Sequence, residues 1–182
     1  MLIAGLMVVV APSLAGCKKK QTTRSPENAI PEMSELKIWR TRSYEDEESR
    51  FRVELPGTPI ETEETDEDPG ALVVRHTAQF RDGDSELLLM WNDLSAPVEE
   101  GEAEHAVLEE VVGGWAEAGL EMSENQPGVL GACSARTLRG TLDKQPVEGR
   151  IAICGDTLIQ IVASGTYVED AKRVFDSFVW LR

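Results

Sequence analysis

Short runs of alternating apolar and polar residues, separated by turn sequences, constrain the fold of this chain more than any other feature. Residues 51–55 (FRVEL) alternate with a period of two, which is typical of a strand with one buried face. Residues 71–80 and 85–93 flank Asp82-Gly83, a dipeptide that favours a tight hairpin turn. Three more strands are predicted near 129–140, 147–154 and 157–164. Because short connections join neighbouring strands, the pattern predicts an antiparallel sheet.

Two segments show helical spacing instead. In residues 97–119, apolar side chains recur along one stripe, which consists of Ala103, Val107, Val111, Trp115 and Ala118. Gly113-Gly114 interrupts this helix, and a helical glycine costs up to about 1 kcal/mol relative to alanine, so we expect a packing role for the pair. The last helix opens on Thr166-Tyr167-Val168-Glu169, a capping-box pattern. Its predicted core face holds Ala171, Val174, Phe175 and Phe178. Helices over an antiparallel sheet make an α+β domain.

The amino-terminal residues 1–16 carry no charge and are mostly apolar, which predicts a signal peptide. The run is shorter than the roughly 20 residues that a membrane-spanning helix needs. Leu14-Ala15-Gly16-Cys17 then resembles the lipobox of bacterial lipoproteins. The resemblance implies a diacylglycerol on the Cys17 sulfur, cleavage before Cys17, and acylation of the new amino terminus. Several acyl chains anchor a protein stably, whereas one chain binds a membrane marginally.

Two features of this segment depart from the usual signal peptide. It has no basic residue before the apolar run, so either the start codon lies upstream or the chain is trimmed. Lys18-Lys19-Lys20 directly follows the cysteine. The competing interpretation is therefore a short membrane anchor in the opposite orientation, with these lysines in the cytoplasm.

Residues 17–48 are predicted to form a lipidated flexible tether, because the stretch is polar and has no sustained periodicity. Its lysines would lie on anionic headgroups, at about 1 kcal/mol each. In lipoproteins that resemble this one, a residue other than aspartate after the cysteine accompanies sorting to the outer membrane, and Lys18 meets that condition. The predicted location is the cell envelope, on the periplasmic face of the outer membrane.

The region from 49 to 182 resembles the PsbP-like family. The resemblance rests on residues 51–59 (FRVELPGTP), on the acidic central helix, and on residues 171–178 (AKRVFDSF). It implies an antiparallel sheet between helices, an α/β/α sandwich. It also implies binding or assembly work rather than catalysis, and the family has no shared catalytic residues to carry over.

The two remaining cysteines, Cys133 and Cys154, are predicted to form a disulfide. In a hairpin whose loop centres near Asp143-Lys144, the numbers of opposed residues sum to about 287, and 133 + 154 equals 287. Export beyond the cytoplasm would make the bond chemically stable. The alternative is a pair of buried free thiols, which behave as small apolar side chains.

The chain is strongly acidic, with 33 Asp and Glu against 18 Lys and Arg and a net charge of -15. This charge argues against nucleic acid as a partner, because phosphate binding needs clustered basic residues. The acids concentrate in residues 45–68 and 99–124. Three interpretations remain open: a surface for a partner with a basic face, a calcium site, or a solvated exterior.

Few residues are candidates for chemistry. His76 falls on a predicted strand and His105 on the acidic helix, and neither has metal-binding spacing, so we expect structural or surface positions for both. The sequence contains no nucleophile motif and no phosphate-binding glycine motif. We therefore expect no catalytic residue, no cofactor and no metal.

Together these features predict a lipid-anchored envelope protein that acts as a noncatalytic binding or assembly module. Its predicted partners are the membrane, through Cys17, and a protein with a basic face. Two alternatives are an enzyme with a pocket between sheet and helix, and a structural or stress-related lipoprotein without a specific ligand.

Overall fold

The computed structural model describes residues 37–45, 50–68, 71–94, 98–99 and 101–181. The predicted signal peptide, Cys17 and the first part of the predicted tether lie outside these residues. In chain order, the elements are β1 Trp39–Glu45, β2 Arg50–Pro56, β3 Ile60–Asp68, β4 Ala71–Asp82, β5 Ser85–Asp93, α1 Glu102–Glu117, β6 Glu121–Leu130, β7 Cys133–Leu142, β8 Gln145–Cys154, β9 Thr157–Ser164, the 3₁₀ turn η1 Gly165–Tyr167, α2 Val168–Ser177 and β10 Val179–Trp180.

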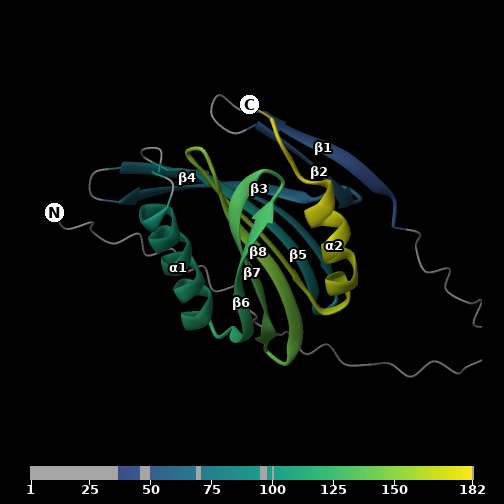
Figure 1. The fold of residues 1–182 in the computed structure, drawn as a ribbon. Coiled ribbons are helices and arrows are strands. Elements are labelled where there is room, and N and C mark those ends of the chain that lie inside the picture. The colour runs from purple at the N-terminus through teal and green to yellow at the C-terminus, as the bar shows by residue number, and fades with distance from the viewer. Residues whose placement is uncertain (1–36, 46–49, 69–70, 95–97, 100, 182) are drawn as a thin grey trace, which may run out of the picture.

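The described strands form two antiparallel sheets, which confirms the predicted α+β class. The larger sheet has seven strands in the order β3-β4-β5-β9-β8-β7-β6, and the smaller has the order β1-β2-β10. Figure 1 shows α1 and α2 on either side of the central strands. No helix in the described part of the chain is long and apolar enough to span a membrane.

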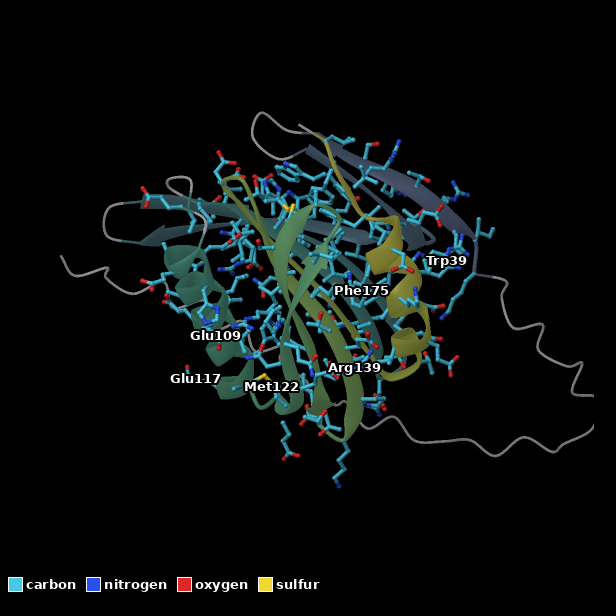
Figure 2. The ribbon with its side chains drawn as sticks, in the orientation of Figure 1. Trp39, Glu109, Glu117, Met122, Arg139 and Phe175 are labelled. Carbon is cyan, nitrogen blue, oxygen red and sulfur yellow. A yellow bond between two sulfur atoms is a disulfide. The ribbon has the colours of Figure 1, made fainter. Side chains whose placement is uncertain are left out.

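The main core lies on the α2 face of the large sheet. There Phe51, Val53 and Leu55 of β2 pack together with α2 and with the inward side chains of β4, β5 and β9. The predicted core residues of the last helix are all buried: Ala171, Val174, Phe175 and Phe178. In Figure 2, Phe175 lies between α2 and the strands. Helix α2 and the small sheet together cover this face.

The second core lies on the opposite face, under α1. Leu108 and Val112 of α1 pack on apolar side chains from β7, β8 and β9. The side of α1 that faces the core is therefore rotated from the stripe that the spacing predicted. Val107, Val111 and Trp115 are half-buried, and Ala103 is exposed. Because α1 is apolar over a wide arc, spacing alone did not identify its innermost side.

The predicted tether over 17–48 is too long at its carboxyl end. Residues Trp39–Glu45 form β1 and pair with β2 along its whole length. Tyr44 packs on Phe51 and Trp91, with ring centroids 5.0 Å and 4.6 Å away. The folded domain therefore begins before residue 49, because pairing with β2 orders a segment whose own sequence is polar.

Two further strands were not predicted. Strand β3 pairs only with β4, at one edge of the large sheet, and β6 pairs with β7 at the other edge. The predicted single strand 129–140 is divided by a turn at Gly131, where φ is +60°. Edge strands have few buried side chains, so they lack the apolar alternation by which strands are recognised.

The capping box predicted at Thr166 does not form. Thr166 lies in η1, and its backbone N–H donates to the Ser85 Oγ at 3.0 Å. Helix α2 begins after this turn, and no side chain caps it. Ser85 satisfies the amide that a capping side chain would otherwise bind, so a tertiary contact replaces the local one.

Candidate ligand-binding groove

A groove of about 630 Å³ separates α1 from the β3–β4–β5 part of the large sheet. It arises because α1 packs on β7, β8 and β9, so the neighbouring strands form a wall opposite the helix. Pockets that hold small ligands have about 300–1,000 Å³ and combine an apolar lining with a few polar groups. The groove falls within that range.

The floor of the groove is apolar. Leu88 and Met90 project from β5, and Val162 projects from β9. Their neighbours Leu87 and Leu89 point to the other face, into the main core. The uninterrupted apolar run of β5 therefore faces both the groove and the main core, which is typical of a strand covered on both sides.

The sheet wall of the groove is polar, and its side chains bind one another. Gln79 donates a hydrogen bond to Glu86, and the Arg81 Nε lies 3.4 Å from the same carboxylate. The Arg75 Nη1 lies 3.8 Å from Glu64 Oε2. These residues follow each other along one face of β4 and of its neighbours.

Trp115 connects the helix to the floor. Its Nε1 donates a 2.8 Å hydrogen bond to the Oε1 of Gln160, a buried side chain of β9. This bond satisfies a polar group that would otherwise be costly to bury. It also fixes the distance between α1 and the sheet, and so the width of the groove.

Gly113 and Gly114 lie on the helix side of the groove. A Cβ placed at Gly113 would meet nothing within 4 Å. The packing role that we expected for this pair is therefore wrong at Gly113. The glycine leaves space in the groove, although it lowers the intrinsic stability of the helix.

Glu110 and Glu117 line the groove on either side of this glycine pair. Both side chains are exposed, and neither has a hydrogen bond or ion pair with another described residue. Figure 2 labels Glu117 at the carboxyl-terminal end of α1. Both belong to the acidic stretch 99–124, but their place in a groove was not predicted from the sequence. The available signal was the spacing Glu110, Gly113, Gly114, Glu117, which places all four on one side of a helix.

The structure contains the predicted disulfide between Cys133 and Cys154. Their Cα atoms are 5.2 Å apart, and the observed register pairs Ser134 with Ile153, so opposed residues do sum to 287. Both cysteines are buried in the main core, away from the groove.

The two histidines lie outside the described lining of the groove. His76 stacks on Trp91 with ring centroids 5.1 Å apart, and its Nδ1 lies 3.6 Å from Glu63 Oε2. His105 is exposed on α1, and its Nδ1 lies 2.8 Å from Arg136 Nη2. Each histidine therefore contacts an aromatic or charged side chain within the fold.

The acids of 45–68 are placed mainly by β3. Glu61, Glu63 and Glu64 are exposed on this edge strand. Charge on an edge strand hinders pairing with the edge of another sheet. Glu61 also accepts a 3.4 Å hydrogen bond from Tyr44, and burial together with Glu61 raises the pKa of that phenol. Among the described residues, no three His, Cys, Asp or Glu side chains converge as metal ligands.

Comparison with known proteins identifies the fold. The sequence matches no protein-family model and no curated protein. The structure is similar to the solution structure of cyanobacterial PsbP (CyanoP) from Synechocystis sp. PCC 6803, with a TM-score of 0.51 and 14% sequence identity. The match covers 84% of this chain and 99% of that chain. The chain therefore has the PsbP-like α+β fold that its strand pattern and terminal motifs predicted.

Proposed function

We propose that this protein is a lipid-anchored envelope protein whose domain is a noncatalytic binding module, and that the groove beside α1 is its binding site. The observation that carries the proposal is the combination of an apolar floor with the carboxylates of Glu110 and Glu117, which pair with no other residue in the described part of the chain. An apolar surface with a few placed polar groups is what a specific binding site requires. The two carboxylates favour a partner with a basic face.

The polar side chains of the sheet wall and of the floor support binding rather than catalysis, because they are engaged with one another. Gln79 and Arg81 are engaged by Glu86, and Gln160 accepts from Trp115. These pairs hold the walls in place. A general acid or base must instead reach a reacting group directly or through one water.

The distribution of charge supports the proposed orientation at the membrane. Residues 17–35 hold four basic and three acidic groups, a net charge of +1, whereas residues 36–182 hold 14 basic and 30 acidic groups, a net charge of -16. Anionic headgroups attract the first segment and repel the second. A lipid on Cys17 would thus hold the acidic domain near the periplasmic face of the outer membrane without pressing it onto the bilayer.

Replacing Cys17 with alanine is expected to abolish incorporation of labelled palmitate and to release the protein from the membrane fraction. The reason is that the lipobox cysteine supplies the only sulfur to which the predicted diacylglycerol attaches. Metabolic labelling followed by fractionation measures both effects. Labelling of the Cys17→Ala variant at the level of the unaltered protein would contradict the lipid anchor.

A photoreactive amino acid at Thr62 is expected to form discrete adducts in intact cells, because this exposed residue lines the groove. The matched control is the same amino acid at Lys172, whose side chain is 82% exposed on α2, across the sheet from the groove. Immunoblots of irradiated cells measure the adducts. Adducts of equal size and yield at both positions, or none at Thr62, would count against the groove as the binding site.

A further inference from the structure

The groove is elongated along α1. Its helix-side lining runs from Val107 to Ala118, which is 11 residue steps. At a rise of about 1.5 Å per residue, this length is about 16 Å, or three turns of a helix. A second helix lying beside α1 would match this length and would cover the wall formed by β3, β4 and β5. Sheets commonly bury such faces under helices.

Gly113 permits close approach at the middle of this length. At Gly113 the space beyond the backbone is empty for 4 Å, whereas most helical residues would present a side chain there. Small residues on one helix let the backbone of a second helix come near. The apolar floor at Leu88 and Met90 then lies within reach of the second helix's apolar face.

The charges of α1 indicate the chemistry of the occupant. Glu110 and Glu117 are seven residues apart, so they lie on the same side of the helix at a spacing of about 10 Å. Lysine or arginine residues seven apart on a second helix have the same spacing. Neither carboxylate forms an ion pair with another described residue, so no ion pair among those residues must break before a cation binds.

We propose that the groove binds a basic amphipathic helix of a partner protein, with its apolar face on Leu88 and Met90 and its cations on Glu110 and Glu117. This inference rests on the proposed binding function and names its partner class. The recognition mode is a helix in a groove, in which apolar anchors recur at helical spacing and charges select the orientation. With the partner helix bound, two helices would cover this face of the large sheet: α1 over β7, β8 and β9, and the partner helix beside it.

The test measures binding of a labelled leucine–lysine model helix, with lysines seven residues apart, by fluorescence anisotropy. The comparison probe carries glutamate in place of lysine. We expect the lysine helix to bind and the glutamate helix not to bind. The Glu110→Gln/Glu117→Gln variant should bind the lysine helix about five- to tenfold more weakly, since two partly exposed ion pairs are lost.

The matched control is Glu102→Gln/Glu169→Gln, which removes the same charge from exposed positions outside the groove. It should change the affinity less than about twofold. Gly113→Leu provides a second, independent variant. We expect it to fold at least as stably, because leucine is a better helix former and its Cβ meets no atom within 4 Å, yet to bind more than tenfold more weakly because its side chain occupies the groove.

The inference is overturned if the glutamate helix binds equally, if both charge variants weaken binding alike, or if Gly113→Leu leaves the affinity unchanged. The last two outcomes would mean that diffuse negative charge, rather than the groove, attracts the probe. Thermal unfolding of each variant confirms that it is folded. Specific adducts at Thr62 without binding of the lysine helix would retain the binding module and refute the helical partner.

Discussion

Replacing Phe175 with alanine is expected to lower the free energy of unfolding by about 3–5 kcal/mol. The side chain is 2% exposed and belongs to the main core, and the Arg150 guanidinium lies over its ring at 4.8 Å. Truncation removes the apolar contacts and leaves a cavity that the surrounding strands fill only in part. Chemical denaturation should show a lower midpoint at an unchanged slope, which identifies a loss of stability rather than a change in compactness.

Lys172→Ala is the control on the same helix. Lys172 is exposed, and its one ion pair with a described residue is that with Asp176, one turn further along α2. Exposed pairs of this spacing contribute little, so we expect a change of less than about 0.5 kcal/mol. A Phe175→Ala variant that loses no more stability than Lys172→Ala would contradict the assignment of Phe175 to the core.

The core face of α2 was predictable because the information is local. Ala171, Val174, Phe175 and Phe178 recur at helical spacing between charged residues, and only one side of the helix is apolar. The hairpin of β4 and β5 was predictable for a similar reason, since Asp82-Gly83 permits the tight turn and Gly83 has a φ of +59°. In both cases neighbouring residues determine the structure.

The edge strands were not predictable from their own residues, because pairing with the next strand in the chain orders them. Strand β1 is ordered by β2, and β3 is ordered by β4 although its own residues favour solvent. A charged edge strand and a solvated loop have nearly the same composition. The acids of 45–68 were therefore treated as one block, whereas the structure places part of them on a strand.

The groove was hidden for a different reason. Its wall comes from β4 and β5, its floor includes Val162 of β9, and its other side is α1. Only the tertiary fold brings these elements together. The sequence does contain the spacing of Glu110 and Glu117 about two glycines, but that spacing acquires meaning when a Cβ at Gly113 is found to face open space.

Removing the disulfide between Cys133 and Cys154 is expected to lower the free energy of unfolding by about 3 kcal/mol. The bond closes a loop with a sequence separation of 21, which restricts the unfolded chain more than the folded one. The paired strands β7 and β8 already hold the two residues together in the native state. The Cys133→Ala/Cys154→Ala variant should therefore keep its fold and its groove while it unfolds at a lower denaturant concentration.

A reductant separates this effect from a simple loss of packing. Both cysteines are buried, so alanine substitution also removes two apolar sulfur atoms from the core. Dithiothreitol should lower the denaturation midpoint of the unaltered protein and leave that of the double-alanine variant unchanged. Equal midpoints of the unaltered protein with and without reductant, once alkylation has verified that both thiols are free, would contradict a stabilising bond. Because the cross-link acts on the unfolded ensemble, the affinity of the groove for its ligand should be the same in both proteins below their midpoints.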